Sequence, residues 1–85
     1  MDVSKIQDIL SAVEGFSEVH VRVQESHYEI IVISDIFEDM KKVQQQQAVY
    51  APLMDYIASG AMHAVTIKTF TLQQWQREKV FHLPG

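Results

Sequence analysis

Two short segments rich in β-branched residues lie close together in the chain, and they constrain its fold more than any other feature. In the first segment, Val19, Val21 and Val23 alternate with polar residues, and the second, residues 28–33, is almost entirely apolar. Alternation and β-branching are typical of strands. Only a few residues separate the two segments, with Gln24-Glu25-Ser26 between them, so we predict a β-hairpin. A hairpin makes a sheet whose apolar face other elements must cover.

Helical periodicity precedes the hairpin, and a helix-capping signal follows it. Apolar residues recur at i, i+3, i+4 and i+7 over residues 4–14, and Ser4 with Gln7 fits a capping box. We therefore predict a helix over residues 4–14. After the second strand, Ser34 and Asp35 are typical of the residues that begin a short helical turn.

A longer helix is expected over residues 41–59, where a second apolar stripe occurs. Pro52 lies inside this stripe, and proline removes a backbone donor and crowds the preceding turn. We therefore expect a kink near Val49, or a helix that restarts at Pro52. The four consecutive glutamines at 44–47 are read as a solvated helix face.

A third strand is predicted over residues 62–70, followed by a helix that carries Trp75 and begins with a capping box of Thr71 and Gln74. Residues 81–85 are expected to form a frayed tail. The order helix, strand, strand, helix, strand, helix predicts an α+β domain: a three-stranded sheet covered on one face by helices. Because a crossover helix leads to the last strand, the sheet should be mixed.

Composition limits what this chain can be. The chain has 85 residues, 47% of which are hydrophobic, so residues 1–85 are enough for a single domain with one core. The chain has no cysteine, which excludes disulfides and thiolate zinc sites. No stretch approaches the roughly 20 apolar residues that span a bilayer, so we expect a soluble, cytoplasmic protein with no membrane association.

Charge is spread unevenly along the chain. Residues 1–40 hold nine acidic residues against two basic ones, whereas residues 41–85 hold two acidic residues against five basic ones. The overall pI of about 5.4 is unlike the high pI typical of nucleic-acid-binding domains.

Several separated motifs follow one another in an order that periodicity alone does not explain. They are Val32-Ile33-Ser34-Asp35-Ile36-Phe37, Val49-Tyr50-Ala51-Pro52-Leu53, Met62-His63-Ala64-Val65 and Thr71-Leu72-Gln73-Gln74-Trp75. Together they resemble the BolA family, and residues 46–54 with the short C-terminus resemble its YrbA/IbaG-like acid-stress branch. The resemblance implies a class II KH-like fold of order αββαβα, in agreement with the elements derived above.

The resemblance also implies a shared iron–sulfur site. Family members pair with monothiol glutaredoxins around a [2Fe-2S] cluster, and two histidines can replace two cysteines on one iron of such a cluster. His63 matches the family's histidine, and His27 matches the position of its proposed second ligand. Without cysteine, the isolated chain would hold no cofactor, so the sulfur ligands would come from the partner's cysteine and its bound glutathione.

From the residues alone, each histidine can also be interpreted as an ordinary structural residue and not a metal ligand. On a strand, His63 would point to the same face as its alternate apolar neighbours, which favours a histidine packed at the core edge and bonded to backbone. His27 fits an ordinary polar residue of a hairpin loop. His20 is expected to be solvent exposed, and His82, near the terminus, is a further candidate for the second ligand.

A second implied activity is DNA binding that regulates transcription, for which Lys41, Lys42 and Lys68 are the candidate contacts. Many family members carry Arg-His-Arg in the long helix, where this chain has uncharged glutamines at 45–47. Members also tend to have glycine after the Phe-acidic pair, where this chain has Asp39. Both differences weaken anion binding, and a solubilising role for the lysines is the alternative.

No arrangement of residues indicates catalysis. The chain has no cysteine nucleophile, and the adjacent Ser26 and His27 would point to opposite faces of an extended strand. Trp75, Phe37 and Tyr50 are interpreted as core aromatics. We therefore predict a non-enzymatic protein. The open face of its sheet would permit a homodimer.

Overall fold

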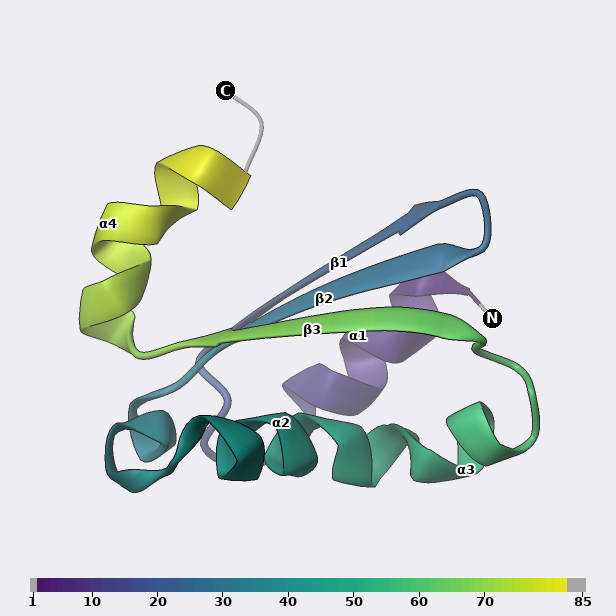
Figure 1. The fold of residues 1–85 in the computed structure, drawn as a ribbon, viewed down its shortest axis with the longest axis horizontal. Coiled ribbons are helices and arrows are strands. Elements are labelled where there is room, and N and C mark those ends of the chain that lie inside the picture. Colours follow the sequence, from purple (N-terminus) through teal and green to yellow (C-terminus); the bar gives the residue numbers. More distant parts are fainter. Residues whose placement is uncertain (1, 83–85) are drawn as a thin grey trace.

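The computed structural model describes residues 2–82 and has an α+β architecture built on a three-stranded mixed sheet (Figure 1). Its elements, in chain order, are α1 (Val3–Ser11), β1 (Glu18–Gln24), β2 (His27–Ile33), the 3-10 helix η1 (Asp35–Asp39), α2 (Lys42–Tyr50), the 3-10 helix η2 (Ala51–Leu53), α3 (Met54–Ala58), β3 (Ala64–Phe70) and α4 (Leu72–His82). The predicted fold class and element order are confirmed. No helix within residues 2–82 is long and apolar enough to cross a membrane.

The sheet has the order β1-β2-β3. β1 and β2 form the predicted hairpin, with Gln24 opposite His27, and β3 runs parallel to β2, with Ala64 opposite His27. Glu25 takes a positive φ of 58° in the turn, which lets two residues reverse the chain. The crossover from β2 to β3 through α2 and α3 explains why the sheet is mixed.

Both faces of the central strand are buried, which explains why residues 28–33 are almost continuously apolar. Alternate side chains of β2, including Ile30 and Val32, belong to the main core beneath α1 and α2. Ile31 and Ile33 face the opposite way and pack against Trp75 of α4. The expectation that helices cover one face is therefore wrong for α4, which lies on the other face (Figure 1).

The N-terminal helix begins earlier than predicted. Its N-cap is Asp2, whose carboxylate accepts from the Ser4 backbone N–H at 3.4 Å. The predicted capping box is wrong because the Gln7 amide donates instead to the Val19 carbonyl of β1. α1 ends at Ser11, three residues before the predicted end.

The interruption expected at Pro52 is confirmed. α2 ends at Tyr50, and the chain passes through η2, in whose first turn Pro52 lies, before helical structure resumes in α3. Proline fits there because the first residues of a helical turn need no backbone donor. The solvated interpretation of the glutamines is wrong for two of them: Gln45 is buried, and Gln46 donates to the Ile67 carbonyl at 2.9 Å.

The capping box before α4 is confirmed on both sides. The Thr71 hydroxyl accepts from the Gln74 backbone N–H at 3.2 Å, and the Gln74 side chain accepts from the Thr71 N–H at 2.9 Å. α4 continues through His82, so the predicted tail is wrong for residues 81 and 82. Residues 83–85 lie outside the described residues.

Candidate functional site

His63 lies in the loop between α3 and β3, immediately before the strand begins at Ala64. Met62 fills the core position just before it and is 1% exposed, whereas His63 is exposed. Gly60, at φ +83°, lies beside the ring: an added Cβ would be 3.4 Å from Cε1, an ordinary van der Waals distance. The core-edge interpretation of His63 is therefore wrong, and the residue is accessible to solvent.

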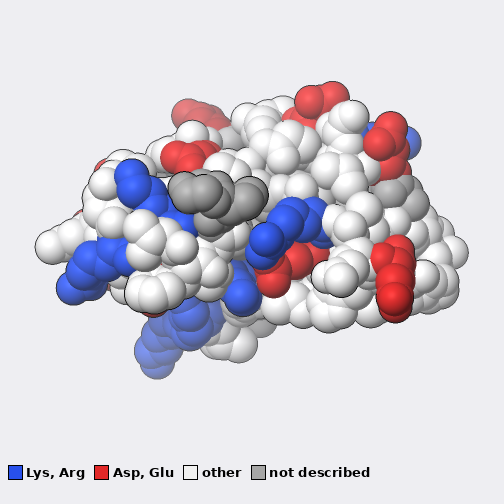
Figure 2. Space-filling model, turned by 90° about the horizontal axis from the view of Figure 1, so that it is seen from above, with Lys and Arg blue, Asp and Glu red and all other residues white. Residues whose placement is uncertain are grey.

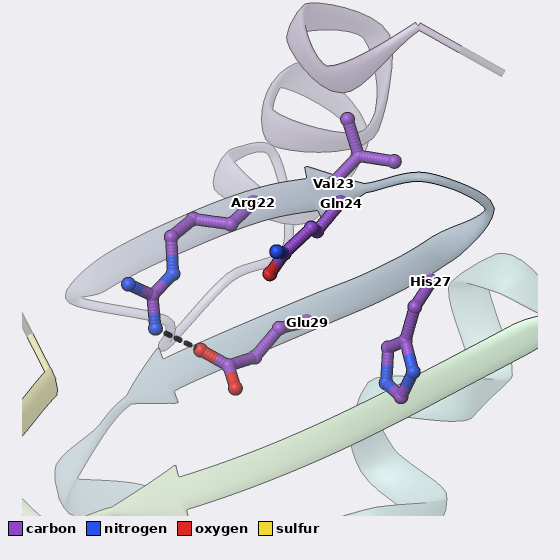
Figure 3. A pocket seen from close by; sticks show the side chains of 5 residues that line it. All are labelled: Arg22, Val23, Gln24, His27 and Glu29. Atoms are coloured by element: carbon purple, nitrogen blue, oxygen red, sulfur yellow. Dashed lines mark hydrogen bonds and ion pairs between the residues drawn. The ribbon is translucent and has the colours of Figure 1, made fainter.

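His27 is the first residue of β2 rather than a loop residue, and its side chain is exposed. Its Nε2 lies 2.7 Å from the Thr66 hydroxyl of β3. Figure 3 shows the ring extending from β2 toward β3 beside a pocket on the open sheet face. Sequence reasoning missed Thr66 because the contact depends on the parallel register between strands distant in the sequence.

The two candidate ligands lie at the same end of the sheet. His27 is opposite Ala64, the residue that follows His63. Strand spacing and rise place the Cα atoms of these two histidines about 6 Å apart. The structure therefore brings the predicted pair together at the level of the backbone.

His82 lies at the opposite end of β3. Its ring centroid is 5.3 Å from that of Phe70, the last residue of the strand. The seven residues of β3, from Ala64 to Phe70, lie between His63 and His82 and span about 20 Å. His27, and not His82, therefore lies near His63 in the fold.

His20 is not the free surface residue that the alternation predicted. Its side chain is 29% exposed, and its Nε2 contacts a Glu18 carboxylate oxygen. The ring also packs against Trp75, with centroids 5.4 Å apart. The prediction failed because α4 covers this end of the face that should have been open.

A small charge network occupies the centre of the open sheet face. Arg22 donates to the Glu29 carboxylate, and the Lys68 ammonium lies 3.5 Å from the other oxygen of Glu29 (Figure 3 shows the first pair). The hydrogen bond from Arg22 is the main reason that the pKa of Glu29 is lowered, and the charges of Lys68 and Arg22 lower it further, against the effect of burial. Lys68 therefore forms a surface ion pair within the chain.

The other two lysines lie at the start of α2. Lys41 is exposed, whereas the Lys42 ammonium donates to the Thr69 carbonyl at 2.8 Å. Lys42 also lines a groove with Arg77 of α4. In Figure 2, basic side chains gather toward the α4 end, apart from the charge pair over the sheet. Lys42 and Lys68 thus each have a partner within the chain, the Thr69 carbonyl and the Glu29 carboxylate.

No group of three or more potential histidine, cysteine or carboxylate metal ligands occurs among residues 2–82. Within that part of the chain, a two-histidine contribution to a metal site needs further ligands from another molecule.

Comparison with known proteins identifies relatives along most of the chain. The family model described as BolA-like protein matches residues 5–74. The acid stress protein IbaG of Escherichia coli is 40% identical over 79 residues, covering 93% of this chain and 94% of that protein. The DNA-binding transcriptional regulator BolA of Haemophilus influenzae is 33% identical over 75 residues, covering 84% of this chain and 72% of that protein.

A solved structure supports the fold assignment. A bolA protein homologue from Coxiella burnetii superposes with a TM-score of 0.73 at 23% identity, covering 91% of this chain and 99% of that one. At this identity the likeness bears on the fold alone. It agrees with the three-stranded sheet and flanking helices described above.

Proposed function

The chain belongs to the BolA family, and on that premise we propose that it is a non-enzymatic cytoplasmic adaptor that pairs with a monothiol glutaredoxin and helps ligate a shared [2Fe-2S] cluster. His63 is the principal ligand in this proposal and His27 the second. The acid-stress name belongs to the Escherichia coli relative, and we extend a role in iron and stress responses to this chain as part of the proposal.

One observation carries the proposal: two imidazoles share one end of the sheet, and His63 is exposed there. No hydrogen bond or ion pair holds the His63 ring within residues 2–82, so the folded protein leaves its nitrogens available. Imidazole binds iron as the neutral base, and two imidazoles on one iron have a precedent in Rieske centres.

The chain's own residues would orient the second ligand. Contact with the Thr66 hydroxyl at 2.7 Å engages one nitrogen of His27 and restrains its ring. Such outer contacts fix the tautomer and orientation of ligating histidines. The other ring nitrogen remains for iron, while the partner's cysteine and glutathione supply sulfur.

Anaerobic reconstitution with a monothiol glutaredoxin, glutathione, iron and sulfide tests the proposal by visible circular dichroism. We expect the mixed complex to give a spectrum that differs from that of the glutaredoxin alone. His63→Ala should abolish the difference, and His27→Ala should alter it. His82→Ala is the matched control and should leave the spectrum unchanged, because His82 lies at the far end of β3. A wild-type spectrum from His63→Ala would exclude that residue as a ligand.

DNA-binding regulation is the second candidate, favoured by the name of the Haemophilus influenzae relative and by the groove that Lys42 and Arg77 share. The ion pair of Lys68 with Glu29 opposes it. If this function holds, affinity for duplex DNA falls steeply with salt, with a slope set by the number of phosphates contacted. Absence of binding at about 50 mM salt, where phosphate contacts are strong, would remove it.

A further inference from the structure

The sheet has two outer edges, along β3 and along β1, and the edge of β3 is covered by side chains of α2. Gln46 donates to the Ile67 carbonyl at 2.9 Å, and Lys42 donates to the Thr69 carbonyl at 2.8 Å. An edge strand with unpaired backbone groups is a template for pairing with another chain, and covering those groups prevents it. The second half of β3 is therefore closed to a further strand.

The edge of β1 is covered at Val19, whose carbonyl accepts from the Gln7 side chain of α1. In an antiparallel pair, successive residues direct their backbone groups alternately toward and away from the neighbouring strand, so Val21 and Val23 point away from β2 as Val19 does. Within residues 2–82, no hydrogen bond reaches these outward groups of Val21 or Val23. The Val23 side chain is also 44% exposed. The second half of β1 is thus an open edge.

We propose that this edge of β1 pairs with β1 of a second copy of the chain, antiparallel and centred on Val21. A two-fold axis at that position places each Val21 opposite the other and each Val23 opposite Val19 of the second copy. The strand suits such pairing because its valines alternate with polar residues, so the apolar face and the polar face both continue across the junction. Pairing about a two-fold axis is closed, so it yields a dimer and not a filament.

The charges of β1 favour this register over its neighbours. Centred on Arg22, the pairing would place the two arginines directly opposite each other, and like charges in that position are destabilising. Centred on His20, it would place Val23 opposite Ser17, which precedes the strand. Centred on Val21, it places Arg22 opposite His20 of the second copy, and the open groups of Val21 and Val23 both gain partners.

The dimer should be weak. It joins one short strand to another, and interfaces that bury less than about 1,200 Å² are typical of transient complexes. The Gln7 side chain already uses one lone pair of the Val19 carbonyl, which leaves the second for the new strand. Each copy carries a net charge of -4, a repulsion that salt screens. Association should therefore need high protein concentration and should not weaken as salt is raised.

Sedimentation velocity of the full chain between about 10 μM and about 1 mM tests the association, because weak interfaces form only at high concentration. We expect the mean mass to rise from 9.8 kDa toward twice that value. Hydrogen exchange at the two ends of this range locates the interface. The amides of Val21 and Val23 should become at least about fivefold more protected in the dimer, because they enter hydrogen bonds, while β2 serves as the internal reference.

A lysine at the open edge should block the pairing, since lysine is common on edge strands that stay unpaired. We expect Val23→Lys to weaken association by about tenfold or more. Val43→Lys is the matched control, because Val43 is 62% exposed on α2 and away from β1, and it should associate as the wild type does. Circular dichroism of each variant checks that the fold is kept.

Three results would overturn the proposal. The first is a wild type that sediments as a monomer at every concentration, a measurement that needs no variant. The second is a dimer in which the Val21 and Val23 amides gain no protection, because that dimer would form through another surface. The third is association of folded Val23→Lys as strong as that of Val43→Lys.

Discussion

At the scale of single residues, the side chain of Gln45 links three elements of the fold. Its amide nitrogen donates to the carbonyls of Phe37 and Met40 at 2.9 and 3.1 Å, and its oxygen accepts from the Thr69 hydroxyl at 2.6 Å. Thr69 is itself fully buried. Within a run of four glutamines this role was not predicted. Gln45 lies one helical turn before buried Val49, so both residues are on the buried face of the helix.

Gln45→Ala is expected to lower the free energy of unfolding by about 2–3 kcal/mol, because it removes the hydrogen bonds of this side chain to the buried Thr69 hydroxyl and to the carbonyls of Phe37 and Met40. Urea denaturation measures the loss. Gln47→Ala is the control from the same run: its side chain is exposed, so its effect should stay within about 0.5 kcal/mol. Equal effects of the two substitutions would contradict the assignment.

Glu29 makes stability depend on pH in the acid range. Its pKa is lowered in the folded protein, chiefly by the hydrogen bond from Arg22. A lowered pKa stabilises the fold above the unfolded value, about 4.3 for glutamate, and this contribution is lost as the pH falls through the folded value.

Unfolding of the wild type and of Glu29→Gln should be compared by urea titration between pH 3 and pH 8. We expect the stability advantage of the wild type to be constant near neutral pH and to shrink below about pH 4, where the free carboxyl takes up its proton. Glu25→Gln, in the exposed turn, is the matched control and should show no such change. An advantage undiminished at pH 3 would refute the ion-pair explanation.

At the scale of elements, sequence motifs correctly predicted those features that interactions between neighbouring residues determine. The hairpin, the break at Pro52 and the cap at Thr71 are set by neighbouring residues, and all three are confirmed. The cap of α1 was misassigned because Gln7 bonds to β1 rather than to its own helix. The position of α4 depends on Trp75 meeting Ile31 and Ile33 across the sheet, which helical periodicity does not encode.

Thr71→Ala should destabilise the protein by about 1 kcal/mol, the usual cost of losing an N-cap hydroxyl. Thermal unfolding followed by circular dichroism measures it. Thr71→Ser keeps the hydroxyl that accepts from Gln74 and should retain most of the stability. If serine proves as damaging as alanine, the threonine acts by packing of its methyl group and not as a cap.

At the scale of the whole molecule, β3 separates two histidine clusters. His63 and His27 lie at its beginning, and His82 packs against Phe70 at its end (Figure 1 shows β3 running from the α3 loop to α4). The sequence supplied the family and both candidate ligands. The sequence alone did not show that these two ligands share one end of the sheet and that His82 lies at the other. The parallel register of β2 and β3 shows it.

The central claim is that this chain donates imidazole nitrogen to iron in a cluster shared with a monothiol glutaredoxin. Pulsed electron paramagnetic resonance of the reduced complex tests it most directly when the histidines of this chain alone carry ¹⁵N. We predict ¹⁵N couplings to the cluster that weaken in His27→Ala and disappear in His63→Ala. A reduced cluster bound in the mixed complex but without ¹⁵N coupling from this chain would contradict the account.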